Sequence, residues 1–135
     1  MKVFIDTNVF LDVFLNRDNG SAKRILKFLV QQDINLFCND ISIINIAYIL
    51  RKRFTKDEIS RIIDKLIDSY IIVPANSKII VDANNSNFKD FEDGVQYFCA
   101  KEINADLIIT NNKKDFNYSE IEILTPVEFD LLYVE

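Results

Sequence analysis

The stretch Lys2-Val-Phe-Ile-Asp-Thr-Asn8, which Asp12 follows shortly, decides the fold. Its apolar part predicts a short β-strand that runs straight into Asp6. A carboxylate placed where a buried strand ends is costly unless hydrogen-bond donors, a cation or a metal compensate its charge. In open α/β sheets, ligands bind beyond the carboxyl ends of the strands. We therefore expect Asp6 to mark the functional site.

The composition predicts a single globular domain. The chain has 135 residues, of which 49% are hydrophobic and 27% charged, and these values are typical of a folded protein. No Pro/Gly/Ser-rich linker interrupts it, so we expect residues 1–135 to form one domain. No apolar run approaches the roughly 20 residues of a membrane span, and Asp6 interrupts any signal-peptide pattern. We therefore expect a cytoplasmic protein without a membrane partner.

The rarer residue types exclude several classes of chemistry. The chain has no histidine, which removes Ser-His and Cys-His nucleophiles and histidine-based ribonuclease chemistry. Cys38 and Cys99 lie far apart in apolar settings, which predicts reduced core thiols rather than a zinc site. Gly20 and Gly94 are the only glycines, and neither can form a phosphate-binding glycine-rich loop. Zinc enzymes and nucleotide-cofactor enzymes are therefore disfavoured.

The net charge of −5 does not suggest a general nucleic-acid-binding protein. Basic residues nevertheless gather locally, at Lys23, Arg24 and Lys27, at Arg51, Lys52, Arg53 and Lys56, and at Lys113 and Lys114. Each cluster has two interpretations. It is either a solvated helix face or a track for a phosphate backbone, and the second gains weight only if an acidic site lies beside it.

Apolar runs and amphipathic stretches alternate along the chain. Strands are predicted at Val3–Ile5, Leu36–Cys38, Ile71–Val73, Leu107–Ile109 and Ile121–Leu124. Helices are predicted at residues 21–30, 43–54, 56–69 and 91–103, with a short final helix that Pro126 opens. This alternation predicts an α/β fold, with a central parallel sheet of four to five strands and helices on both faces.

In such a fold the helix N-termini and strand C-termini share one edge, where polar residues far apart in sequence converge. They are Asp6, Thr7 and Asn8; Asp40, Ser42 and Asn45; Asp90, Glu92 and Asp93; and Thr110, Asn111, Asn112 and Asp115. Clustered carboxylates repel one another, so their pKa values should rise unless a cation lies among them. Oxygen ligands without histidine or cysteine favour Mg²⁺ or Mn²⁺ over zinc or copper.

Several of these residues also have a structural interpretation. Asp90 fits the N-cap of the helix that follows, while Asp93 shares its helical face and is the better candidate for a metal ligand. Asp40 fits a cap or a turn. Asn8 could cap the segment that follows it or orient the carboxylate of Asp6.

Four stretches together resemble a known family. They are Phe4-Ile-Asp-Thr-Asn-Val-Phe-Leu-Asp12, Ile41-Ser-Ile-Ile-Asn45, Asp90-Phe-Glu-Asp93 and Ile108-Ile-Thr-Asn-Asn-Lys-Lys-Asp-Phe116. In this order and spacing they resemble the PIN-domain family, and within it the VapC-like toxins of toxin–antitoxin pairs. The resemblance implies a three-layer α/β/α PIN-like fold and a metal-dependent endoribonuclease that acts on single-stranded RNA.

The resemblance also implies roles for individual residues. Asp6, Asp93 and Asp115 would be the acidic ligands of Mg²⁺ or Mn²⁺. Thr110 and Asn112 would support the last of these ligands. Asn8 would be the partner of the first.

The sequence departs from the resemblance at Asn45, where many PIN nucleases have a glutamate. One negative charge is therefore missing from the first turn of that helix. An amide oxygen still ligates Mg²⁺ weakly or through water. Asp12 or Asp90 could restore part of the missing charge.

Our leading hypothesis is phosphodiester hydrolysis by an RNA-cleaving toxin of a type II toxin–antitoxin system. One or two Mg²⁺ or Mn²⁺ ions would polarise the phosphate, generate hydroxide from water and stabilise the leaving oxygen. The RNA backbone would be held by Arg51, Lys52, Arg53, Lys113 and Lys114. Tyr48 and Tyr97 are candidates for base stacking, with core packing as the alternative for both.

Two other functions compete with this hypothesis. The first is a PIN-fold binding module for RNA or a protein partner, catalytically weakened at Asn45, in which Asn45→Glu should create or raise nuclease activity. The second is a phosphatase with Asp6 as its nucleophile. The phosphatase is disfavoured because Asn8 stands where its general acid would be, and because the chain is short for a substrate-covering cap.

The resemblance finally implies partners. It implies a cognate antitoxin, whose C-terminal segment fills the acidic groove, and a homodimer. One predicted helix carries more apolar residues than a single core face needs, namely Ile43, Ile44, Ile46, Ile49 and Leu50. Part of this set could form the dimer contact, and burial between the sheet and neighbouring helices is the alternative.

Overall fold

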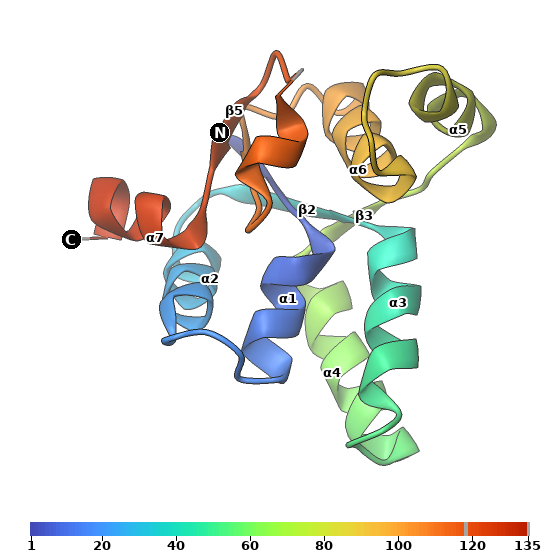
Figure 1. Ribbon diagram of the computed structural model, residues 1–135. Coiled ribbons are helices and arrows are strands. Elements are labelled where there is room, and N and C mark those ends of the chain that lie inside the picture. Colours follow the sequence, from blue (N-terminus) through green and yellow to red (C-terminus); the bar gives the residue numbers. More distant parts are fainter. Residues whose placement is uncertain (118, 135) are drawn as a thin grey trace.

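A parallel sheet of five strands forms the centre of the protein in the computed structural model (Figure 1), which describes residues 1–117 and 119–134. The strands are β1 Lys2–Ile5, β2 Asn35–Asn39, β3 Ile71–Val73, β4 Leu107–Ile109 and β5 Glu122–Leu124. Their order is β3-β2-β1-β4-β5, and every neighbouring pair is parallel. The predicted α/β fold with a parallel sheet is confirmed.

The helices connect these strands. They are α1 Thr7–Phe14, α2 Ser21–Gln31, α3 Asp40–Leu50, α4 Lys56–Ser69, α5 Ser77–Asn84, α6 Phe91–Glu102 and α7 Pro126–Phe129, with a 3-10 helix η1 at Lys113–Phe116 and a π-helical segment η2 at Asp130–Val134. None of the described helices has the length and apolar character to cross a membrane.

The sequence-based helix predictions were wrong at three places. Helix α3 begins at Asp40 rather than at residue 43, because the side chain of Asn39 accepts a hydrogen bond from the Ile41 backbone N–H at 2.8 Å and caps the helix earlier. Helices α1 and α5 were not predicted. Both are short, with 8 residues each, so their sequence patterns give little signal.

Two hydrophobic cores cover the two faces of the sheet, because successive strand residues point to opposite sides. Val3 and Ile5 of β1 point into the core formed with α1–α4 and α7, whereas Phe4 points into the core formed with α5 and α6. Figure 1 shows α5 and α6 on one side of the sheet and α1, α3 and α4 on the other. The three-layer α/β/α arrangement is therefore confirmed.

The strand order places a topological switch point between β1 and β4. From β1 the chain proceeds outward to β2 and β3, and it then returns to the opposite side of β1 for β4 and β5. The carboxyl ends of β1 and β4 meet there, where the backbone N–H of Asp6 donates to the carbonyl of Ile109 at 3.0 Å. Open α/β sheets bind ligands at such a point.

The two cysteines belong to the core, as predicted. Cys38 and Cys99 are both buried and free, and burial raises the pKa of each thiol to about 12. The side-chain amide of Asn39 donates to Sγ of Cys99 at 3.0 Å. Both thiols are therefore protonated and unreactive at neutral pH.

Candidate active site

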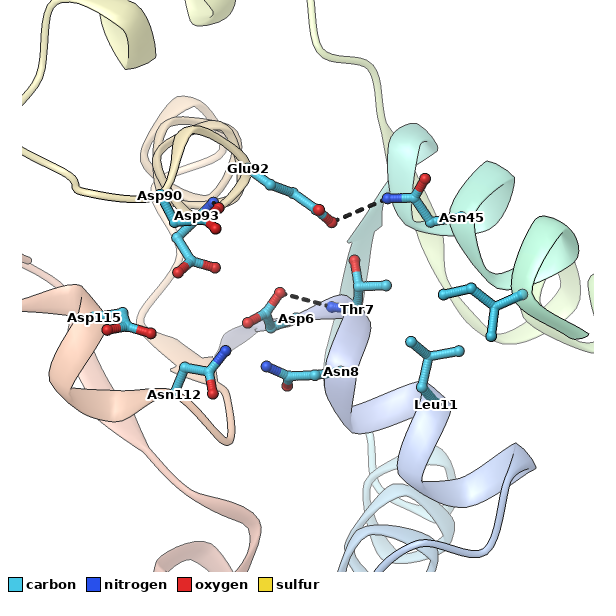
Figure 2. A pocket seen from close by; sticks show the side chains of 11 residues that line it. Asp6, Thr7, Asn8, Leu11, Asn45, Asp90, Glu92, Asp93, Asn112 and Asp115 are labelled. Carbon is cyan, nitrogen blue, oxygen red and sulfur yellow. Dashed lines mark hydrogen bonds between the residues drawn. The ribbon is translucent and has the colours of Figure 1, made fainter.

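An open cavity of about 250 Å³ lies beyond the carboxyl ends of β1 and β4 (Figure 2). Its walls come from the end of β1, the first turns of α1 and α6, the middle of α3, and the segment after β4. It is lined by Asp6, Thr7, Asn8, Leu11, Asn45, Ile49, Asp90, Glu92, Asp93, Asn112 and Asp115. The three predicted acidic ligands thus line one cavity, although Asp6 and Asp115 are 109 positions apart in the sequence.

Asp6 is the most constrained carboxylate of the cavity. Only 3% of the residue is exposed, and both carboxylate oxygens accept hydrogen bonds. The Thr7 backbone N–H donates to Oδ1 at 2.7 Å, and the Thr110 hydroxyl donates to Oδ2 at 2.7 Å. The pKa of Asp6 is raised to about 6, mainly by burial. The two hydrogen bonds lower it, and the charges of Glu92 and Asp90 raise it.

Asp93 lies in the first turn of α6 and is also buried, with 8% exposed. Burial raises its pKa to about 7, and the charges of Asp6, Asp90, Asp115 and Glu92 act in the same direction. The rise predicted from the sequence is thus found for Asp6 and Asp93, but its main cause is burial, and the predicted repulsion between neighbouring carboxylates is a smaller contribution.

Asp90 serves as the N-cap of α6 and lines the cavity at the same time. Its Oδ1 accepts from the Asp93 backbone N–H at 3.1 Å. Asp40 is confirmed as a structural residue, since its Oδ1 accepts from the backbone N–H groups of Ile41 and Ala75 at 2.9 and 3.2 Å. Asp40 does not line the cavity.

The supporting polar residues lie close to their predicted places but make different contacts. The Thr110 hydroxyl contacts the first acidic residue, Asp6, rather than the last, and it accepts from the Asn112 backbone N–H at 3.0 Å. Asn8 accepts from the Asn111 backbone N–H at 3.2 Å. This contact ties α1 to the segment after β4, so the position of Asn8 supports the loop rather than the carboxylate of Asp6.

A buried polar network beneath the cavity was not predicted. The side-chain amide of Gln96 donates to the hydroxyls of Thr7 and Ser42 at 3.1 Å each, and these hydroxyls lie 2.5 Å apart. The network joins α1, α3 and α6, which all line the cavity. The sequence could have indicated Gln96, because it lies three positions after Asp93 and residues three apart share a helix face.

Glu92 was expected at this edge of the sheet but was given no role in the predicted site. It lies in the first turn of α6, and its Oε1 accepts a hydrogen bond from the Asn45 side-chain amide at 3.1 Å (Figure 2). Asp12, one of the residues expected to restore charge, points elsewhere. It pairs with Nε of Arg17 at 3.3 Å, accepts a hydrogen bond from Asn111, and does not line the cavity.

The predicted basic residues are distributed unevenly around the cavity. Arg51, Lys52 and Arg53 directly follow α3, and Arg51 comes two positions after Ile49, which lines the cavity, although none of the three basic residues lines it. Lys113 pairs with Glu128 at 2.9 Å. Lys114 instead lines a neighbouring hollow of about 300 Å³ together with Lys89, Asp115 and Asn117. Lys89 was not predicted.

The two candidate stacking residues differ in exposure. Tyr97 is only 3% exposed and its hydroxyl accepts from the Glu120 backbone N–H at 3.2 Å, so it packs in the core and cannot stack on a base. Tyr48 is 62% exposed and the Arg51 guanidinium lies 4.2 Å from its ring centroid. Neither tyrosine lines the cavity.

The donor set of the cavity fits a hard divalent cation. The described lining residues offer carboxylate and amide oxygens, and no lysine or arginine is among them. Mg²⁺ and Mn²⁺ prefer such oxygen ligands. Among the residues that the structure describes, no three or more Asp, Glu or Cys side chains are already grouped as a metal site, so a cation would have to draw these carboxylates together. The cavity is thus an open set of anionic donors.

Comparison with known proteins identifies the family. The family model described as PIN domain matches residues 2–114. The chain belongs to the PIN-domain family. Asp115 lies one position beyond the matched range, and the cavity nevertheless includes it.

Individual relatives agree with this membership. The chain is 31% identical over 135 residues to Ribonuclease VapC1 of Aquifex aeolicus (strain VF5), covering 95% of this chain and 92% of that protein. The resemblance to VapC-like proteins is thereby confirmed.

Solved structures show the same fold. VapBC2 from Rickettsia felis, bound to a DNA fragment from its promoter, matches with a TM-score of 0.68 and 17% identity, over 93% of this chain and 98% of that one. A toxin–antitoxin complex from Klebsiella pneumoniae matches with a TM-score of 0.69 and 18% identity, over 92% and 97%.

We predict that Asp93→Asn stabilises the metal-free protein near neutral pH. The pKa of Asp93 is about 7 when folded, against an ordinary value of 3.8. The folded chain therefore binds this proton more tightly than the unfolded chain, and the contribution of Asp93 to stability falls as pH rises from 4 to 7. The variant should gain on the order of 2 kcal/mol in free energy of unfolding at pH 7.5, and much less at pH 4.

Urea unfolding in the presence of a chelator measures this difference. Asp57→Asn is the matched control, because Asp57 is an exposed aspartate in the first turn of α4. It should show no gain at either pH. An Asp93→Asn gain of the same size at both pH values would contradict the raised pKa.

We also predict that Thr110→Val raises the pKa of Asp6 above its value of about 6. Valine keeps the shape of threonine but removes the hydroxyl that donates to Oδ2, and this hydrogen bond favours the charged carboxylate. The expected increase is about one pH unit. A carboxyl ¹³C NMR titration of the metal-free protein measures it, and an unchanged or lower pKa would refute the assignment.

Proposed function

We propose that this chain is an Mg²⁺- or Mn²⁺-dependent endoribonuclease that hydrolyses phosphodiester bonds in single-stranded RNA. The observation that carries the proposal is the convergence of Asp6, Asp93 and Asp115 on one cavity at the switch point of the sheet. The similarity to Ribonuclease VapC1 of Aquifex aeolicus supports the choice of RNA as the substrate.

The three aspartates would hold the cation, which supplies positive charge that polarises the phosphate and lowers the pKa of water. A nearby cation also favours the charged form of Asp6 and Asp93, which lowers their raised pKa values. Thr110 and the Thr7 backbone N–H fix both oxygens of Asp6. With no histidine in the chain, a carboxylate is the available proton acceptor at this site.

Positive groups around the cavity would orient the substrate. The N-termini of α1 and α6 lie at the cavity, and their backbone dipoles favour a phosphate there. Lys89 and Lys114 line the adjacent hollow, which shares Asp115 with the cavity. A phosphate backbone that crosses both hollows would contact these two lysines directly.

We further propose that the chain acts as the toxin of a type II toxin–antitoxin pair. Several structurally similar proteins were solved as toxin–antitoxin complexes. A cognate antitoxin would place its C-terminal segment in the acidic cavity and exclude RNA from it.

Cleavage of single-stranded RNA with and without divalent cations tests the enzymatic proposal. Wild-type protein should cleave with Mg²⁺ or Mn²⁺ and lose cleavage in a chelator. Asp6→Asn and Asp115→Asn should each lose at least about 100-fold in rate, because each removes one charged ligand. Asp57→Asn should retain full activity. Metal-dependent cleavage that survives Asp6→Asn would refute the site.

We also propose a homodimer that forms through the outer face of α3. The structure divides the apolar residues of this helix, since Ile46 and Leu50 are buried whereas Ile44 and Tyr48 are 66% and 62% exposed. Exposed apolar side chains of this kind typically mark a protein contact.

Light scattering tests the dimer. Wild-type protein should have twice the mass of the chain, and Ile44→Glu should have the mass of one chain, because a charge in an apolar contact is costly. Val81→Glu places the same charge on α5 at a residue that is 55% exposed, and it should leave the dimer intact. A wild-type monomer at high concentration would refute the proposal.

A further inference from the structure

Glu92 and Asn45 form a contact across the cavity that the three-aspartate site does not use. The two residues come from different helices, the first turn of α6 and the second turn of α3, and the amide Nδ2 of Asn45 lies 3.1 Å from Oε1 of Glu92. Both side chains line the cavity, and Figure 2 shows the Glu92 side chain reaching across it toward Asn45.

A glutamate in the first turn of a helix can extend into water and still interact favourably with the positive end of the helix dipole. Glu92 is exposed and free to do this. Its carboxylate is instead held by an amide from the opposite wall, which keeps the negative charge over the cavity. This placement needs a second explanation besides helix stability.

The charge of Glu92 acts electrostatically on the buried carboxylate of Asp6. Among the like charges that raise the pKa of Asp6, Glu92 has the largest effect, ahead of Asp90. It raises the pKa of Asp93 as well. Glu92 therefore belongs electrostatically to the acidic site, although it lies on the side of the cavity away from Asp115 (Figure 2).

The chemistry of the pair explains why position 45 carries an amide. A second carboxylate there would repel Glu92 at hydrogen-bond distance, whereas the amide of Asn45 donates to it and leaves one negative charge on this side. The other Glu92 oxygen, Oε2, makes no hydrogen bond to the residues that the structure describes and is available to a ligand in the cavity.

We propose that Glu92 is a further carboxylate ligand of the divalent cation and that Asn45 positions the Glu92 side chain. The pair then supplies from α6 a negative charge opposite Asp115. This inference rests on the proposed metal-dependent function, because it adds a residue to the same cation site.

Binding of Mn²⁺ to the metal-free protein, measured from the electron paramagnetic resonance signal of free Mn²⁺, tests the inference without an activity assay. Glu92→Gln should weaken Mn²⁺ binding by about tenfold, because it keeps the shape and removes the charge. Glu102→Gln is the matched control at the other end of α6, where Glu102 is exposed and does not line the cavity. It should bind Mn²⁺ as the wild type does.

A swap of the pair tests the role of Asn45. Asn45→Glu combined with Glu92→Gln keeps one carboxylate and one amide across the same contact, so it should recover most of the affinity that Glu92→Gln loses. Asn45→Glu alone places two carboxylates together and should not match the swap in thermal stability without metal. A swap that binds no better than Glu92→Gln would overturn the pairing.

The outcomes separate this inference from the function on which it rests. Asp6→Asn in the same titration should abolish binding at the site. If Asp6→Asn loses Mn²⁺ and Glu92→Gln binds within twofold of wild type, the role of Glu92 is wrong and the metal site stands. If Asp6→Asn binds Mn²⁺ normally, the proposed metal site itself is wrong.

Discussion

The burial of one negative charge at the end of β1 is the constraint on which the site depends. Asp6 is 3% exposed and lies where β1 and β4 meet, so its charge must be compensated from within the protein. Thr7 donates from the start of α1 and Thr110 donates from the end of β4. The Thr110 donor is present only because the strand order brings β4 beside β1, so this half of the compensation depends on the topology.

The rest of the structure offsets the unfavourable free energy of placing these carboxylates close together. The pKa values of Asp6 and Asp93, about 6 and 7, show that both charges are unfavourable in the folded chain near neutral pH. Two hydrophobic cores and the buried Gln96 network hold the surrounding helix ends in place against this repulsion. A site that is strained when empty gains stability when a ligand supplies positive charge.

The sequence predicted the fold and the acidic edge because both depend on short patterns. Buried strands followed at once by Asp6 or by Thr110 fix which side chains converge, whatever the loops between them do. The contact between Asn45 and Glu92 could not be predicted in this way. It depends on how α3 and α6 are rotated and placed relative to each other, and neither helix sequence specifies that. Helix α1 was missed because its 8 residues are too few for a clear pattern.

The charge distribution implies that a cation would serve RNA binding as well as chemistry. The chain carries a net charge of −5, and the described cavity wall contains acidic but no basic side chains. A phosphate that approaches this wall is repelled until positive charge lies between the two. Arg51, Lys52 and Arg53 do not line the cavity, and Lys113 is paired with Glu128. Lys89 and Lys114 lie close enough to help, so on the proposed function the bound cation links substrate to enzyme and binding should depend on it even in a variant that cannot cleave.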